Sequence, residues 1–361
     1  MERDFFEKQQ LCDLNFDALT RRDDYDTVPV CLPDEEYSFL HEAAGIAYHG
    51  RIFAAWYQNK KAELRGETPI FWTHSDDGGK TFAKKRLLAV DPTGAILFCP
   101  PVFGICHDRL YMLINEMAQK PDHIHALDLY IYHEETDAFE FLWSKPIPFK
   151  LNTNVVAMDN GKLLLPGRIG ELDSFPDVPA VLISDSGEID GDWRLVKMQE
   201  DHFLPDGSHF VHPEQTAIVD KNRITMFCRT DDNILPVLFV SEDYGETWSL
   251  PILYDVPVSN SKIYAGTLSD GRNYWIGSAI KGREKLCLLV TKPGEKQFTA
   301  GCLLQDGPSE QFPGSGLQWS YPVAFEDRQT LYAIYTASLG GEDQAYRGAV
   351  LTKIPFDRLP E

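Results

Sequence analysis

One eight-residue pattern occurs twice in this chain and constrains its fold more than any other feature. The first copy runs from Ser75 to Phe82 and the second from Ser241 to Trp248, and both fit Ser-x-Asp-x-Gly-x-Thr-aromatic. In such a segment the Ser and Asp side chains bond nearby backbone N–H groups, and the Gly takes a conformation that other residues resist. The Thr and the aromatic residue then enter a strand. The pattern predicts a structural turn that closes a hairpin, repeated within one fold.

Weaker versions of this turn fill the intervals between the two clear copies. They lie at Ser184 to Trp193, at Thr291 to Phe298 and around Tyr132 to Phe141. The turns therefore recur about every 50–57 residues, a spacing that suits four-stranded propeller blades. At that period the 361 residues of the chain accommodate about six blades and an N-terminal extension.

The segments between the turns have the pattern of short strands. Runs such as Leu286–Val290 and Leu331–Tyr335 alternate with Gly, Asp and Asn turns, and no long helical pattern occurs. The sequence thus predicts an all-β protein, a six-bladed β-propeller. We expect residues 1–37 to form an N-terminal extension that packs on the propeller, and residues 38–361 to form a single propeller domain.

The charge of the chain limits its partners. The formal net charge is −21, which excludes nucleic acid and anionic membrane surfaces, because no basic field would offset the repulsion of phosphates. An anionic substrate would have to be drawn in by a local cluster of arginine and lysine. The sequence leaves the oligomeric state open.

The N-terminal region and the cysteines bear on location. Residues 1–20 mix charged side chains with no apolar segment, and no run is long enough to span a bilayer. The seven cysteines are scattered, several of them within apolar strands, which favours reduced thiols in a cytoplasmic protein. A removed signal sequence would leave the same appearance.

Four phrases between the turns carry a resemblance to a known family. They are His41-Glu-Ala-Ala-Gly-Ile, His212-Pro-Glu-Gln-Thr-Ala-Ile, Val258-Ser-Asn-Ser-Lys and Trp319-Ser-Tyr-Pro-Val. Together with the repeated turns, they resemble the sialidase (neuraminidase) superfamily of six-bladed propellers, in its BNR/Asp-box branch. The resemblance extends over nearly the whole chain. It implies a glycoside hydrolase whose pocket lies on the central axis.

The resemblance implies a tyrosine nucleophile. Tyr321, in Ser-Tyr-Pro, fits that position, and Glu214, in His-Pro-Glu-Gln, fits the glutamate that activates it. Sialidases depart from the usual carboxylate nucleophile, because a substrate with a carboxylate on its anomeric carbon would repel an anion, whereas a neutral phenol avoids this repulsion. The alternatives are a core or rim aromatic for Tyr321 and an ordinary strand-end salt bridge for Glu214 with Arg229.

Sialidases also bind the substrate carboxylate with three arginines. Arg229 fits one of these positions and Arg283 fits a second loosely, with a solvated loop charge as its alternative. Arg168 and Lys262 are further cations at strand ends that we expect to bind substrate, although Arg suits bidentate contact with a carboxylate better than Lys. The first arginine is missing. His41 stands there and cannot supply the same fork of donors, so we assign it a sugar hydroxyl or a proton transfer.

The general acid is expected in the loop after the first long strand. Only Glu63 and Glu67 are available there, and we choose Glu63; either needs a raised pKa to protonate a leaving oxygen. A solvated charged loop is the alternative reading for both. His123-x-His125 lacks a third ligand at a diagnostic spacing, so the sequence predicts no metal and no cofactor.

These residues lead to one hypothesis and two alternatives. The hypothesis is a sialidase-like exo-glycosidase that hydrolyses a terminal, acidic sugar of a small oligosaccharide or glycoside with retention of configuration. One alternative is an inactive carbohydrate-binding propeller. The other is a polysaccharide lyase on the same scaffold, with His41 and Tyr321 as its base and acid.

Overall fold

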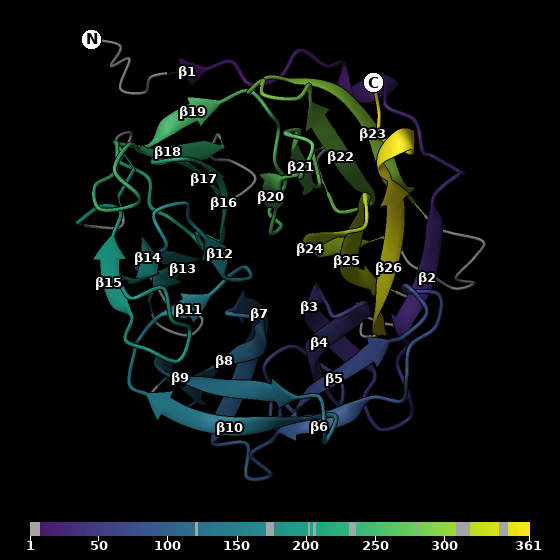
Figure 1. Cartoon of the computed structure of the whole chain (residues 1–361), viewed down its shortest axis with the longest axis vertical. Helices are drawn as coiled ribbons and strands as arrows, with labels where there is room; N and C mark the ends of the chain where they lie inside the picture. Colours follow the sequence, from purple (N-terminus) through teal and green to yellow (C-terminus); the bar gives the residue numbers. More distant parts are fainter. Residues whose placement is uncertain are drawn as a thin grey trace.

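The chain folds into a six-bladed β-propeller (Figure 1). The computed structural model describes residues 8–119, 122–170, 177–200, 203–204, 207–230, 236–279, 282–307, 318–338 and 346–361. Within these residues the regular structure consists of strands and the two short 3-10 turns η1 (Phe16–Ala18) and η3 (Phe356–Arg358). Neither turn is long or apolar enough to cross a bilayer. The predicted all-β class and six-bladed architecture are confirmed.

Apart from β1 and β2 near the N-terminus, the strands of each blade follow one another along the chain, and the first of them lies nearest the axis. Blades 1 and 2 contain β3 (Phe39–Tyr48), β4 (Arg51–Asn59), β5 (Ile70–Ser75), β6 (Arg86–Ala89), β7 (Ile96–Cys106), β8 (Arg109–Gln119), β9 (Asp122–His133) and β10 (Ala138–Lys145). Blades 3 and 4 contain β11 (Lys150–Leu151), β12 (Val156–Ala157), β13 (Leu163–Ile169), β14 (Val178–Ser184), β15 (Arg194–Lys197), β16 (Gln215–Asp220), β17 (Arg223–Cys228), β18 (Val237–Ser241) and β19 (Ile252–Tyr254). Blades 5 and 6 contain β20 (Tyr264–Thr267), β21 (Asn273–Gly277), β22 (Lys285–Thr291), β23 (Phe298–Asp306), β24 (Trp319–Asp327), β25 (Thr330–Ser338) and β26 (Arg347–Pro355).

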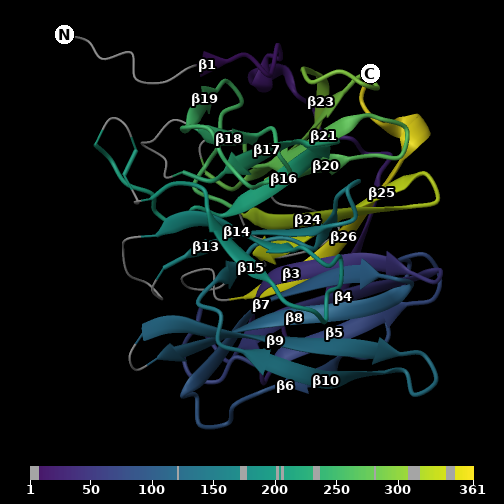
Figure 2. The same cartoon turned by 60° about the vertical axis from the view of Figure 1, so that its left-hand side comes forward.

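The N-terminal segment takes part in the blades themselves. Strand β2 (Asp26–Cys31) pairs antiparallel with β26 and supplies the outermost strand of blade 6. Strand β1 (Lys8–Gln9) adds a parallel strand to β19, and the segment between β1 and β2 passes β23 on the outside (Figures 1 and 2). The predicted N-terminal extension, residues 1–37, thus contains β2, which joins the beginning of the chain to its end and closes the ring.

Large side chains pack between neighbouring blades and hold the ring together. Trp56, Trp275 and Trp319 are fully buried and come from blades 1, 5 and 6. Trp56 and Trp319 belong to one continuous apolar cluster that joins blades 1, 5 and 6, whereas Trp275 belongs to a cluster that joins blades 4 and 5. Truncating such an aromatic side chain to alanine costs about 3–5 kcal/mol, so the packing between blades contributes strongly to the stability of the ring.

The repeated turns join the third and fourth strands of their blades, on the outer side of the ring. In the first copy, Asp77 Oδ1 accepts hydrogen bonds from the backbone N–H groups of Lys80 and Thr81 at 2.9 and 3.0 Å. In the second copy, Asp243 Oδ1 accepts from Thr247 N at 2.9 Å, and Gly245 has φ +86°. The hydrogen bonds follow the predicted pattern, and the turns lie far from the axis.

Irregularities at the innermost strands aim polar side chains at the axis. The register of β3 shifts between His41 and Ala44, where Glu42 has φ +50°. The register of β24 shifts in the same way around Tyr321, which has φ +59°. Such β-bulges re-aim a side chain, and they are common next to active sites. The bulge in β3 directs the Glu42 carboxylate, and the bulge in β24 directs the Tyr321 phenol, toward the same axial space.

Candidate active site

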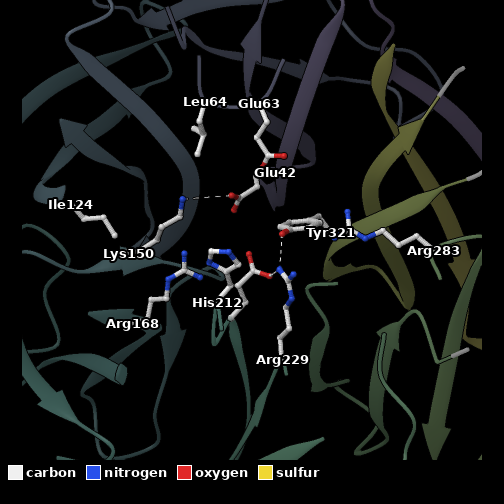
Figure 3. Close-up of a pocket in the computed structure, with 11 residues that line it drawn as sticks. Glu42, Glu63, Leu64, Ile124, Lys150, Arg168, His212, Arg229, Arg283 and Tyr321 are labelled. Carbon is white, nitrogen blue, oxygen red and sulfur yellow. Dashed lines mark hydrogen bonds and ion pairs between the residues drawn. The ribbon is translucent and has the colours of Figure 1, made fainter. Parts of the chain in front are cut away.

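A pocket of about 250 Å³ lies where the six blades meet. Its lining residues come from every blade (Figure 3) and are Glu42, Glu63, Leu64, Ile124, Lys150, Arg168, His212, Glu214, Arg229, Arg283 and Tyr321. Most of them carry an ionisable group, so the pocket is polar and highly charged. It is suited to a small polar ligand with an anionic group and several hydroxyls.

Tyr321, Arg229 and Glu214 meet on one side of this pocket. Arg229 Nη1 donates to the Tyr321 hydroxyl oxygen at 2.9 Å and to Glu214 Oε2 at 2.6 Å (Figure 3). All three side chains are buried. Strand pairing brings Glu214 and Arg229 together, because β16 and β17 are neighbours and Arg229 N also donates to the Glu214 carbonyl oxygen at 2.8 Å. Tyr321 reaches this pair from β24 in blade 6.

The charges around these three residues define their resting protonation. Burial raises the pKa of the Tyr321 phenol; the charge of Arg229 opposes this effect, and that of Glu214 adds to it. Burial also acts to raise the pKa of Glu214, but the charges of Arg229, Arg168 and Lys262 outweigh it and lower that pKa to about 2. At neutral pH the resting site therefore holds a neutral phenol and a carboxylate.

Arg229 lies between Glu214 and Tyr321, the two groups predicted to exchange a proton. Among the described residues, no hydrogen bond joins Glu214 directly to the Tyr321 hydroxyl, and Arg229 bridges them instead. The guanidinium stabilises the carboxylate and occupies the phenol oxygen. A proton transfer from Tyr321 to Glu214 thus requires Arg229 to find another anionic partner.

Three further cations surround the same space. Arg168 is buried with its Nε 3.4 Å from Asp177 Oδ2, and its Nε and Nη1 make no hydrogen bond to a described residue. Arg283 donates from Nη2 to the Asn260 carbonyl oxygen at 2.7 Å, and its guanidinium lies 5.5 Å from the centre of the Tyr321 ring. The ammonium of Lys262 lies 6.0 Å from that ring centre. The pocket is locally cationic in a chain of net charge −21.

Glu63 lines the pocket from the loop between β4 and β5, whereas Glu67 does not. The Glu67 carboxylate instead lies 3.5 Å from Lys60 Nζ, outside the pocket. The Glu63 side chain is exposed to solvent on one side, and protein atoms surround it on the others. Partial desolvation raises the pKa of Glu63, and the charge of Glu42 adds to this shift. Of the two carboxyl groups considered from sequence, only Glu63 lies in the pocket.

His41 is not among the residues that line the pocket. It is 1% exposed, its Nδ1 lies 3.1 Å from Thr336 Oγ1, and its ring centre lies 4.1 Å from that of Tyr321. Burial lowers the pKa of His41, and nearby cations, including Arg347 and Arg283, lower it further. A neutral imidazole packed against Tyr321 supports that ring. The structure thus places His41 behind Tyr321 and outside the lining of the pocket, and its contact with a sugar hydroxyl stays a prediction.

Glu42 and Lys150 also line the pocket, where their charged groups lie close together, and no motif in the sequence had indicated either of them. Glu42 Oε1 lies 3.9 Å from Lys150 Nζ, and Glu42 Oε2 lies 3.8 Å from Lys262 Nζ. Glu42 directly follows His41, and the bulge in β3 turns it, rather than His41, toward the axis. The sequence shows that His41 stands where sialidases have an arginine. The side chain that lines the pocket is the next one along the chain, Glu42.

Other groups of potential metal ligands lie elsewhere. His125 Nε2 is 3.1 Å from Glu116 Oε2, and the rings of His123 and His125 are 5.2 Å apart. Cys106, His107 and Glu188 also form a compact group, with His107 Nε2 2.9 Å from Glu188 Oε1. Neither group lines the pocket.

Comparisons with known proteins agree with this architecture. A family model described as a BNR repeat-like domain matches residues 142–334, more than half of the chain, whereas no curated protein matches. A protein of unknown function from Dyadobacter fermentans shares 13% identity with a TM-score of 0.72, over 92% of this chain and 100% of its own. The Hadza microbial sialidase Hz136 shares 12% identity with a TM-score of 0.73, over 92% and 69% of the two chains. An α-L-arabinanase of Penicillium chrysogenum, complexed with arabinobiose, shares 12% identity with a TM-score of 0.63, over 92% and 98%. At such identities the likeness shows a common fold alone, and it is a fold that glycosidases use.

Proposed function

This chain belongs to the family of BNR repeat-like domains, and we propose that it is a sialidase-like exo-glycosidase that hydrolyses a terminal, acidic sugar with retention of configuration. One observation carries the proposal: the Tyr321 hydroxyl, the Arg229 guanidinium and the Glu214 carboxylate are in contact on one side of the axial pocket. Tyr321 is the nucleophile, Glu214 takes its proton, and Glu63 protonates the leaving oxygen.

Substrate binding is the task of the arginines. Arg229, Arg168 and Arg283 present guanidinium groups to one small pocket, and two donors of Arg168 are unused by the described residues. Planar forks of this kind bind carboxylates in pairs of hydrogen bonds. The cationic pocket attracts a sugar acid toward a protein whose overall charge would otherwise repel it.

Binding of the sugar carboxylate also activates the nucleophile. In the resting site the charge of Arg229 is the largest influence that lowers the pKa of Glu214, so Glu214 is a weak base. When Arg229 shares its charge with the substrate carboxylate, this influence weakens and the pKa of Glu214 rises. Glu214 then accepts the phenol proton, and the base becomes available only when a substrate is present.

The reaction proceeds in two displacements. The Tyr321 oxygen forms a bond to the anomeric carbon as the glycosidic C–O bond breaks, and Glu63 donates its proton to the departing oxygen. Glu63, now a carboxylate, takes a proton from a water molecule that attacks the same carbon. The bond to Tyr321 breaks, and Glu214 returns the proton to the phenol. Two inversions at one carbon retain its configuration.

A non-catalytic carbohydrate-binding propeller is the second candidate. The observation in its favour is the resting contact of the Tyr321 hydroxyl with a cation instead of with Glu214. Polysaccharide lyase chemistry through His41 has no comparable support, because His41 is buried behind Tyr321 and does not line the pocket. Reaction products therefore decide between hydrolysis and binding.

We also propose a reducing compartment such as the cytoplasm. All seven cysteines are free thiols, and six of them are buried. Reduced, buried cysteines are typical of proteins that work in such a compartment.

The direct test is turnover of aryl glycosides of sugar acids by the protein and by Tyr321→Phe. We expect hydrolysis by the protein and a loss on the order of 10³-fold or more in the variant, because the nucleophilic oxygen is removed. Tyr335→Phe is the matched control: its buried hydroxyl bonds Gln305 and Thr352, away from the pocket. Equal turnover by Tyr321→Phe on any substrate found contradicts the assignment, whereas sugar binding without any product favours the second candidate.

A further inference from the structure

Glu42 is held in the pocket at a cost to the fold. It is 5% exposed and has φ +50°, in the left-handed region that favours glycine. A non-glycine residue in this region is strained, and burying a carboxylate adds a further cost unless it is well paired. Such features persist where the surrounding structure enforces them, and they cluster at ligand sites. The position therefore calls for a functional explanation.

The partners of Glu42 satisfy it incompletely. Its Oε1 accepts a weak hydrogen bond from the Cys99 thiol at 3.3 Å. Its Oε2 is buried and makes no hydrogen bond to any residue that the structure describes. The ammonium groups of Lys150 and Lys262 lie at 3.9 and 3.8 Å, close enough to balance the charge but beyond hydrogen-bond distance. The pocket thus contains a charged acceptor with unused bonding capacity.

The missing partner must be a donor. A carboxylate only accepts hydrogen bonds, so Oε2 cannot bind the anionic group of a sugar acid, and it repels one that is placed beside it. A sugar hydroxyl is the donor that a glycoside offers in a pocket of this size. A charge-assisted O–H to carboxylate bond is roughly twice as strong as a neutral one.

Glu42 lies close to the proposed nucleophile. Lys262 Nζ lies 3.8 Å from Glu42 Oε2 and 6.0 Å from the centre of the Tyr321 ring. Figure 3 shows Glu42 and Tyr321 turned toward the same space, with Arg229 and Arg283 flanking the tyrosine. The cations for the sugar carboxylate and the carboxylate for a hydroxyl therefore lie within reach of one bound sugar ring.

We propose that Glu42 is a specificity-determining residue: it accepts a hydrogen bond from the hydroxyl on the ring carbon next to the reacting carbon. The substrate class is then the sugar acids that keep this hydroxyl, of which hexuronates are the common case. The 3-deoxy sugar acids, which lack it and carry their carboxylate on the reacting carbon, are rejected. This inference rests on the proposed function, because it uses Tyr321 to locate the reacting carbon. Bonds to this hydroxyl strengthen in the transition state of glycoside hydrolysis.

The test measures binding separately from turnover. The ligands are the phenyl glycosides of glucuronic and galacturonic acid, in both anomeric forms, and their 2-deoxy counterparts. Each is titrated by calorimetry into the protein, into Glu42→Gln and Glu42→Ala, and into the control Glu67→Gln. We expect the protein and Glu67→Gln to bind one hexuronide about 10- to 100-fold more tightly than its 2-deoxy counterpart, the range for a hydrogen bond to a charged group. Glu42→Ala removes the preference, and the isosteric Glu42→Gln, which keeps the shape of the wall, reduces it.

Each outcome bears on one of the two proposals. If both Glu42 variants still prefer the hexuronide over its 2-deoxy counterpart, the proposed role of Glu42 is overturned. Tighter binding of a 3-deoxy sugar acid than of the hexuronides also overturns it. In both cases hydrolysis that depends on Tyr321 would still uphold the proposed function. A Glu42-dependent preference without hydrolysis upholds the contact between Glu42 and the hydroxyl and overturns the proposed reaction. A protein that binds neither hexuronide overturns the inference. Thermal melting of each variant separates a lost contact from a lost fold.

Discussion

The hairpin turns at the edge of the ring and the pocket at its axis use similar polar residues in opposite ways. In the turn at Ser241 to Trp248, Asp243 bonds residues at most four positions away and uses both carboxylate oxygens. In the pocket, Arg229 bonds Tyr321 from 92 positions away. Buried donors and acceptors of Arg168 and Glu42 are left without hydrogen bonds to described residues. The polar groups of the turns make hydrogen bonds that stabilise the fold, whereas polar groups of the pocket remain available to bind a ligand.

The largest effect on turnover after removal of the nucleophile is expected from Glu214→Gln. The substitution removes the base and should lower turnover by about 10²- to 10⁴-fold. It should also destabilise the fold by about 3–5 kcal/mol, because the buried Arg229 loses the charge that it pairs with. Turnover of a sugar acid substrate and chemical denaturation measure the two effects.

A surface pair provides the control for Glu214. Glu246 Oε1 lies 2.9 Å from Arg194 Nη2 near the second turn, and Glu246→Gln should change stability by less than about 1 kcal/mol. Equal effects of the two substitutions on turnover or stability would show that the pocket pair is no more than an ordinary ion pair.

Glu63 should determine the alkaline limb of the pH profile. Desolvation raises the pKa of Glu63, and a general acid is active only while it is protonated, so turnover falls as the pH rises through that pKa. Glu63→Gln should lower turnover of alkyl glycosides by about 10²-fold or more. The loss should be smaller for substrates with a nitrophenolate leaving group, which needs less protonation. A pH profile unchanged by Glu63→Gln assigns the acid to another residue.

Asp243→Asn should affect stability alone. It weakens the bonds to Thr247 N and Thr247 Oγ1, and we expect a loss of about 1–2 kcal/mol. Turnover per folded molecule should remain unchanged, since the turn lies on the outer side of blade 4. A large fall in turnover per folded molecule would contradict the view that the turns act on stability alone and the pocket on turnover.

The smallest effect concerns the pH dependence of this turn. Burial acts to raise the pKa of Asp243, but its hydrogen bonds with Thr247 and Ser241 outweigh burial and lower that pKa. A depressed pKa in the folded state contributes stability that is present above the unfolded value of about 3.9 and is lost as the pH falls toward the folded value. The free energies of unfolding of the protein and of Asp243→Asn, measured by denaturation, should therefore converge as the pH falls below about 4. Parallel curves would contradict this.

Local chemistry explains which parts of the fold were predictable. The turns could be located from eight residues, because their hydrogen bonds stay within the segment, and their spacing revealed the blades. The pairing of β2 with β26 could not be predicted, since it joins opposite ends of the chain and depends on how the ring closes. For this reason the sequence did not indicate that the N-terminal extension supplies a strand to blade 6.

The site was predictable only in part, and through resemblance. Tyr321, Glu214, Arg229, Arg283 and Arg168 all line the pocket, and short motifs or strand ends had marked each of them. Glu42 was missed because side chains alternate along a strand, and a one-residue bulge reverses which neighbour faces the axis. The sequence around His41 contains no signal that locates that bulge.

Covalent trapping tests the central claim most directly. A 5-fluoro hexuronosyl fluoride keeps the ring hydroxyls but slows both steps, so the glycosyl enzyme should accumulate. Peptide mapping by mass spectrometry should then find one sugar attached to the peptide that contains Tyr321, and none in Tyr321→Phe. Attachment to a carboxylate such as Glu42 or Glu63, with Tyr321 unmodified, would contradict the account.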